Sequence, residues 1–229
     1  MIQKLTTCTD CDFKSSCFQQ LSNDELLLAN ESKVQVAYKK GETILKQGSF
    51  VTHILYIKDG IVKVYRENQD NTSTIFTVQS KGNLIGLPAL FYSGVFDYSV
   101  AALSESKICA IDKKVMEQLA KDNSDFVTTV IQNLNQEMSQ LKEKMISLTL
   151  KQLNGRLADS LLHLANHVYM SDSFKLNLSR KDLAEFSGMS TMSVVRTLQQ
   201  FIKNEIIEEQ EGVLKILAKD KLEQLALIK

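Results

Sequence analysis

The sequence lacks several features that would place it in a common class of protein. Its 229 residues carry 27 basic and 27 acidic side chains, so a formal net charge of zero gives no general attraction to nucleic acid. No apolar run approaches the roughly 20 residues that a membrane-spanning helix needs. The first residues, MIQKLTTCTD, have no apolar core of a signal peptide. We therefore expect a cytoplasmic protein with no membrane partner.

Catalytic signatures are also scarce. Only three histidines occur, His53, His163 and His167. The last two are four residues apart, a spacing that could bind a metal on a helix, but the leucines beside His163 indicate ordinary helix faces. No nucleophile motif, phosphate-binding loop or dinucleotide fingerprint is present. We expect no enzyme, and no catalytic residue is assigned.

Cysteine is rare and unevenly placed. Cys8, Cys11 and Cys17 follow the spacing C-x2-C-x5-C, and Cys109 lies far downstream. Four thiolates are the number that a tetrahedral zinc or an iron–sulfur cluster needs. In the cytosol, clustered cysteines bind metal or sense redox state more often than they form disulfides. Two alternatives stay open: zinc or no metal on the first three, and Cys109 as a small buried apolar residue.

Residues 33–112 have the pattern of β-structure. Asp59-Gly60 joins two alternating apolar runs and is a strong hairpin signal, because glycine accepts a positive φ. Many short strands at even spacing are typical of a small barrel or roll. The expected strands are rich in Val, Ile, Tyr and Phe and recur about every ten residues: Val34–Tyr38, Thr43–Leu45, His53–Ile57, Ile61–Tyr65, Ser73–Val78, Ser99–Leu103 and Ser106–Ile111.

Residues 113–150 change to a helical period with apolar positions spaced alternately by four and three. Such a narrow stripe on an otherwise polar helix favours a two-stranded seam between two copies of the chain. The alternative is a helix packed on its own β-domain, which usually shows a wider apolar face. The predicted seam residues are Val127, Ile131, Leu134, Met138, Leu141, Met145 and Leu148.

Residues 151–229 predict a second compact unit, opened by an amphipathic helix over Arg156–Met170. Ser179 can cap a short helix over Arg180–Phe186, and Gly188 can end it with a left-handed turn. Ser190 can cap the next helix, Thr191–Lys203, so that the pair forms a helix-turn-helix. Two alternating runs around Gln210-Glu211-Gly212 predict a small wing, and Lys219–Leu227 can form a closing helix.

These pieces together carry a resemblance over nearly the whole chain. The matching segments are YKKGETILKQGS at 38–49, ILYIKDGIVKVY at 54–65, GLPALF at 86–91, the heptad helix, and LSRKDLAEFSGMSTMSVVRTLQQF at 178–201. In this order they resemble the Crp/Fnr family of bacterial transcription regulators. The resemblance implies an α+β protein with four parts. These are a cysteine-bearing arm at 1–20, a cyclic-nucleotide-binding-like β-roll at 21–118, a dimerisation helix at 119–150 and a winged helix-turn-helix at 151–229.

The family resemblance implies a homodimer that binds a two-fold symmetric DNA site and contacts RNA polymerase. In such proteins the second helix enters the major groove, where an arginine can pair with guanine. Well-known members carry Glu at the position of Met192, so we expect tolerance or a thymine preference where Glu would demand cytosine. The wing carries Glu208, Glu209 and Glu211, which would repel phosphate. The expected DNA-binding residues are Arg180, Lys181, Ser190, Thr191, Met192, Ser193, Arg196 and Lys203.

The family resemblance also bears on the ligand. Cyclic AMP binding in the family uses a Glu and an Arg that correspond here to Leu87 and Asp97, so cyclic AMP is not expected. The cysteine spacing resembles the oxygen-sensing Fnr branch, which implies a 4Fe–4S cluster on Cys8, Cys11, Cys17 and Cys109 as metal ligands. The alternatives are a regulator without a cluster that senses another small ligand in the roll, and a dimeric ligand-binding module without DNA function.

Overall fold

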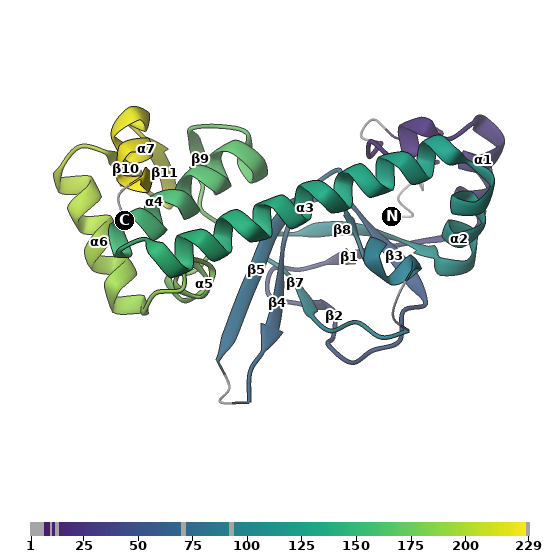
Figure 1. Ribbon diagram of the computed structural model, residues 1–229, viewed down its shortest axis with the longest axis horizontal. Helices are drawn as coiled ribbons and strands as arrows, with labels where there is room; N and C mark the ends of the chain where they lie inside the picture. The colour runs from purple at the N-terminus through teal and green to yellow at the C-terminus, as the bar shows by residue number, and fades with distance from the viewer. Residues whose placement is uncertain (1–6, 10, 12–13, 70–71, 92–93, 228–229) are drawn as a thin grey trace. The chain divides into compact units, whose positions relative to one another are not determined.

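The computed structural model describes residues 7–9, 11, 14–69, 72–91 and 94–227 (Figure 1). The chain divides into two compact units. The first unit is formed by Met1–Val62 with Gln79–Ser139, and the second by Lys63–Val78 with Gln140–Lys229. Within the residues just given, no helix is long and apolar enough to cross a membrane.

The β-roll consists of two four-stranded sheets, with strand orders β1-β8-β3-β6 and β2-β7-β4-β5. Strand β8 lies between β1 and β3 and pairs antiparallel with both. In the register of these strands, Cys109 is paired with Gln35 of β1 and with Tyr56 of β3. The strands are β1 (Lys33–Tyr38), β2 (Thr43–Leu45), β3 (His53–Asp59), β4 (Ile61–Glu67), β5 (Ser73–Ser80), β6 (Leu84–Ile85), β7 (Ser99–Ala102) and β8 (Ser106–Asp112).

Each strand expected from the sequence is present. The Asp59-Gly60 turn is also present, with Gly60 at φ 95°. The predicted hairpin is wrong, because the turn joins β3 of one sheet to β4 of the other and these two strands do not pair. Strand β6 was not expected because two residues are too short to show an alternating pattern. It is followed by the 3-10 turn η2 (Leu87–Leu90).

Two short helical segments, η1 (Phe18–Gln20) and α1 (Asn23–Glu31), precede the roll and were not expected. A sequence signal for α1 exists. Ser22 caps the helix by accepting from the backbone N–H of Glu25, and the Glu25 carboxylate accepts from the N–H of Ser22. This reciprocal capping box is readable as Ser-x-x-Glu.

The helical region after β8 consists of α2 (Lys113–Asp122) and α3 (Ser124–Leu150), separated at Asn123. The dimerisation helix expected from residue 119 therefore begins at Ser124. The Asn123 side chain accepts from the N–H of Phe126 at 2.9 Å and donates to Glu25 of α1, so the break is fixed by hydrogen bonds. Figure 1 shows α1 and α2 beside the beginning of α3.

The seam residues of α3 divide into two groups. Val127 and Leu134 pack against the hydrophobic core of the first unit, and Leu148 lies against Gly188 in the second. The exposed group is Ile131, Met138, Leu141 and Met145. One edge of the predicted stripe thus packs on the chain itself, whereas the other presents apolar side chains to solvent. The seam as a dimer contact stays a prediction.

The second unit contains the expected winged helix-turn-helix. Its helices are α4 (Leu153–His163), continued by a π-helical turn (Leu164–Tyr169), then α5 (Arg180–Ser187), α6 (Thr191–Lys203) and α7 (Lys219–Leu227). A three-stranded sheet has the order β10-β11-β9, in which β10 (Ile207–Gln210) and β11 (Val213–Ile216) form the wing. Strand β9 (Ser173–Lys175) was not expected, again because it is short.

Candidate DNA-reading helix and cysteine pocket

The turn between α5 and α6 is fixed by the residues that the sequence marks. Ser179 caps α5 with Asp182 in a reciprocal box, and Ser190 caps α6 by accepting from the N–H of Ser193 at 3.1 Å. Gly188 ends α5 at φ 63°. The Ser190 and Ser193 hydroxyls also bond to each other at 2.9 Å. Both serines therefore help to build the turn, whether or not they also contact DNA.

Helix α6 buries one face and exposes the other. Val194, Leu198 and Phe201 are buried, whereas Met192 and Arg196 project outward, with the Met192 side chain 75% exposed. The helical period adds two residues to this surface that the sequence reasoning missed, Val195 and Gln199. Exposed residues of α6 include Thr191, Met192, Val195, Arg196, Gln199 and Lys203.

The two basic residues at the start of α5 differ in their surroundings. Arg180 donates from Nη2 to both carboxylate oxygens of Glu209 in β10, at 2.5 and 2.6 Å. Lys181 is largely exposed and lies 3.8 Å from Glu185. Glu209 of the wing was expected to repel phosphate. It instead forms an ion pair with Arg180, whose guanidinium was expected to bind phosphate.

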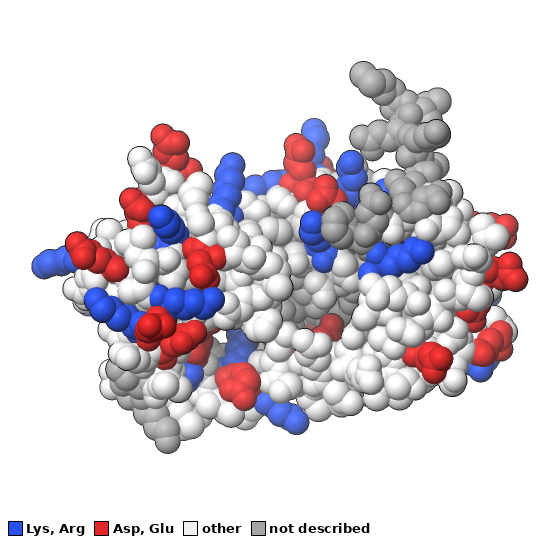
Figure 2. Space-filling model, turned by 90° about the horizontal axis from the view of Figure 1, so that it is seen from above, with Lys and Arg blue, Asp and Glu red and all other residues white. Residues whose placement is uncertain are grey.

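The C-terminal part of the chain, with the winged helix-turn-helix, shows little net basicity. Residues 151–229 contain 11 Lys and Arg against 10 Asp and Glu, a difference of +1. On the face seen in Figure 2, cationic and acidic side chains lie interspersed. Affinity for a phosphate backbone therefore depends on where individual cations such as Arg196 and Lys203 sit, rather than on a general positive field.

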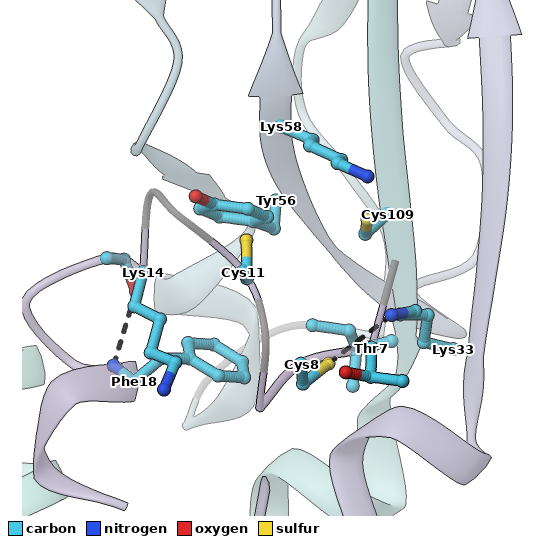
Figure 3. A pocket seen from close by; sticks show the side chains of 11 residues that line it. Thr7, Cys8, Cys11, Lys14, Phe18, Lys33, Tyr56, Lys58 and Cys109 are labelled. Atoms are coloured by element: carbon cyan, nitrogen blue, oxygen red, sulfur yellow. Dashed lines mark hydrogen bonds between the residues drawn. The ribbon is translucent and has the colours of Figure 1, made fainter. Parts of the chain in front are cut away.

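The first unit holds a pocket lined by residues from the N-terminal arm and the roll (Figure 3). Cys8, Cys11 and Cys109 line it, so thiols separated by about a hundred residues meet at one place. Three lysines, Lys14, Lys33 and Lys58, belong to the same lining. The remaining lining residues are Thr7, Ser15, Phe18, Tyr56 and Ile111.

Hydrogen bonds hold Cys8 at the pocket. Asn30 of α1 accepts from the backbone N–H of Cys8 at 3.0 Å and from Lys33 Nζ at 2.9 Å. Lys33 Nζ in turn lies 3.6 Å from Cys8 Sγ. Figure 3 shows Lys33 directed at Cys8, and Lys58 directed at Cys109. Helix α1, missed from the sequence, is thus what anchors the arm.

Two of the thiols that line the pocket hold their protons more tightly than a free cysteine does. Burial raises the pKa of Cys8 and of Cys109, and the positive charge of Lys33 offsets part of this rise in both. Lys58 further opposes the rise at Cys109. A metal that binds these sulfurs must therefore displace protons.

Cys17 stands apart from the other three thiols. It is fully buried and does not line the pocket. Its sulfur accepts from Asn133 Nδ2 of α3 at 3.2 Å, and burial raises its pKa to about 11. The structure thus brings together three of the four predicted metal ligands. In the part of the chain that is described, no three His, Cys, Asp or Glu side chains are arranged to hold a metal ion.

The Tyr56 hydroxyl is the unexpected polar group of the pocket. The residue is 93% buried, and its hydroxyl lies within hydrogen-bonding reach of the Cys11 thiol. In Figure 3 the ring lies beside the Cys11 sulfur. Burial, followed by the negative charge that a Cys11 thiolate would carry, raises the Tyr56 pKa.

Two family profiles match the two halves of the chain. "Cyclic nucleotide-binding domain" matches residues 35–123 and "Crp-like helix-turn-helix domain" matches residues 155–225. The chain belongs to the Crp/Fnr family of transcription regulators. It is a DNA-binding regulator rather than an enzyme.

Named relatives cover almost all of the chain. The fumarate and nitrate reduction regulatory protein of Vibrio cholerae is 25% identical over 96% of this chain and 90% of its own length. The protein of the same name from Escherichia coli K12 is 24% identical with the same coverage. FixK2 from Bradyrhizobium japonicum has the same fold, with a TM-score of 0.78 and 18% identity over 86% of this chain and 98% of its own.

A Crp/Fnr fold does not by itself specify the ligand of its roll. At the position where the family's cyclic AMP motif has Glu, Leu87 is buried in the core, and Asp97 is exposed where the motif has Arg. An anionic Asp97 would repel a nucleotide phosphate. The expectation that cyclic AMP is not the ligand therefore stays a prediction, supported by these two side chains.

Proposed function

We propose that this Crp/Fnr regulator acts as a homodimer whose DNA binding is controlled by oxygen or redox state. The control site consists of Cys8, Cys11, Cys17 and Cys109. The observation that carries the proposal is the meeting of Cys8 and Cys11 with Cys109 in one pocket. Relatives named for fumarate and nitrate reduction add support, at low identity.

The donor set fits a thiolate-bound group in its chemistry. Three cysteines and no carboxylate are among the described residues that line the pocket, and thiolates select zinc, copper(I) or iron–sulfur clusters. Cys17 becomes the fourth only if its sulfur leaves Asn133 and turns toward the pocket. A 4Fe–4S cluster, when bound, would supply a reaction with oxygen that ends in loss of the cluster.

The chain's own residues prepare the pocket for an anionic group. Lys33 and Lys58 place positive charge beside Cys8 and Cys109, and thiolates carry the opposite charge. Asn30 fixes the backbone of Cys8. The core around Phe18 and Phe126 excludes water on one side of the arm.

Anaerobic purification with iron, sulfide and visible-absorption measurements tests the cofactor. We expect about four iron atoms per chain in the wild type, and loss of iron in Cys109→Ala. Ile108→Val is the matched control, because it removes one methylene from the same strand and leaves every thiol in place. A colourless wild type without iron under strict anaerobiosis would remove the cofactor from the proposal.

A second ligand has support from the same pocket. Three lysines and the Tyr56 hydroxyl line the pocket, which favours a small anion that accepts hydrogen bonds. This is a regulator of the same class without a cluster. This second ligand would be favoured if the wild type carries no iron and a small anion changes its DNA affinity, while the same anion leaves the DNA affinity of Tyr56→Phe unchanged.

For DNA recognition, we propose that the outward face of α6 reads bases and that Arg196 pairs with guanine. In selection from random duplexes, Arg196→Ala should relax one guanine position at a cost of ~1–3 kcal/mol. Lys203→Ala should weaken binding to all sequences alike. A cytosine demanded at the position read by residue 192 would contradict the role given to Met192.

RNA polymerase is a further partner in this proposal. One candidate contact, the loop Glu67–Ser73, includes residues 70 and 71, which lie outside the described part of the chain.

A further inference from the structure

Asn133 joins the cysteine arm to the long helix. Its Nδ2 lies 3.2 Å from Cys17 Sγ and 3.1 Å from Ser16 Oγ. It stands on α3 between the buried Val130 and the exposed seam residue Met138. The only fully buried thiol of the chain's described part is thus held by the helix that carries the predicted dimer contact.

The bond fixes Cys17 on the side away from the pocket. Cys17 is the residue that precedes η1, and it has helical backbone angles, with φ −63° and ψ −44°. To reach the other three thiols, this residue must change its side-chain direction and give up the contact with Asn133. The contact is therefore present in the three-thiol arrangement and lost in a four-thiol one.

We propose that Asn133 is a positioning residue that holds the Cys17 thiol out of the pocket until a metal takes it. Release of Cys17 then leaves Asn133 of α3 with its bond to Ser16 Oγ. This inference rests on the proposed function, in which the four thiols bind a metal-containing group.

Titration of the reduced full-length protein with Co²⁺ under anaerobic conditions tests the competition, because thiolate-bound Co²⁺ absorbs visible light. Asn133→Ala removes the competing bond. It should not impair folding, because Asn133 is only half-buried and alanine is the best helix former. A hydrogen bond of ordinary strength corresponds to about a five-fold change. We expect Co²⁺ to bind Asn133→Ala about five-fold more tightly than wild type.

Asn135→Ala is the matched control, because Asn135 is exposed on the same helix. It should bind Co²⁺ like wild type. A purely structural role for Asn133 predicts weaker binding in Asn133→Ala, since the site would be loosened. Equal or weaker binding would therefore overturn the inference and leave the metal site standing. A wild type that binds no Co²⁺ would overturn the metal-binding proposal and this inference together.

Discussion

Alanine substitutions at Gly60 and Gly48 compare the loss of stability caused by one added methyl group in a crowded and in an open place. Both have positive φ, 95° and 85°. A Cβ at Gly60 would lie 2.6 Å from Glu105 O and from Ser106 Cα, whereas a Cβ at Gly48 would have nothing within 4 Å. Gly48→Ala should therefore cost ~1–2 kcal/mol for the left-handed backbone alone. Gly60→Ala should cost roughly twice as much, because backbone atoms must also move.

Urea unfolding of the two glycine variants, followed by circular dichroism, measures the difference. Equal midpoints for Gly60→Ala and Gly48→Ala would show that the turn between β3 and β4 relaxes around the added methyl group.

Because the surroundings of His163 disfavour its charged form, we expect the stability of the second unit to fall in acid. Burial, then the charges of His167 and Lys144, lower its pKa to about 4 from an ordinary 6.5. Between pH 6.5 and 4 the unfolded chain binds a proton that the folded chain does not, so stability falls as pH falls through this window. His163→Phe keeps a ring against Phe186 and removes the titration. From pH 7 to 4.5 the wild type should lose about 2 kcal/mol more than the variant.

Thermal melting of both proteins across this pH range measures that difference. At pH 7.5, where His163 is neutral in both states, the wild type should show none of this loss. Parallel pH profiles would mean that another group controls the acid response.

At the scale of elements, local signals in the sequence predicted the fold well where they were strong. Helix α6 was expected at Thr191–Lys203 and found there, because Ser190 caps its start and a wide apolar face fixes its period. Helix α7 and strand β2 also have the expected bounds. Each of these elements carries its own turn or cap residues and needs no distant contact to be recognised.

The elements that were missed depend on distant contacts or are too short. Strand β6 has two residues and is defined by its pairing with Leu55 and Tyr56. The break before α3 depends on Asn123 bonding to Glu25, about a hundred residues away. The same holds for the site. The four cysteines could be listed from the sequence, but the contact of Cys17 with Asn133 could not be.

The pairing of α5 with the wing predicts an unusual gain of function. Glu209→Gln removes the carboxylate that holds Arg180 and frees the guanidinium for a phosphate. DNA affinity should rise, and the slope of log affinity against log salt should steepen by about one per site. Glu208→Gln is the control. Glu208 is exposed, and its substitution removes the same charge without affecting the ion pair of Arg180.

Binding at several salt concentrations separates the two variants. If Glu208→Gln matched Glu209→Gln in affinity and slope, the gain would come from net charge alone and the pairing with Arg180 would be irrelevant.

At the scale of the whole molecule, the low net charge of the DNA-binding part and the exposed apolar stripe on α3 both favour a dimer. Residues 151–229, with a net charge of +1, gain little from phosphates, so we expect two copies to act on one DNA. The exposed side chains Ile131, Met138, Leu141 and Met145 are the predicted means of joining two chains. Because the side chains on the other edge of the stripe are already packed, we expect the dimer contact to depend on this exposed group.

Met138→Glu tests the dependence of DNA binding on the dimer. Met138 is 55% exposed, so the substitution should leave the monomer folded. In a dimer it places two charges at an apolar contact, which costs several kcal/mol. We expect a monomer in sedimentation and a loss of at least about a hundred-fold in affinity for a two-fold symmetric site, with little change for a single half-site. Ser139→Glu, exposed at the next position, should remain dimeric and bind normally. A dimeric Met138→Glu would show that the chains associate through another surface, and a monomer that still binds the full site tightly would show that one winged helix-turn-helix suffices.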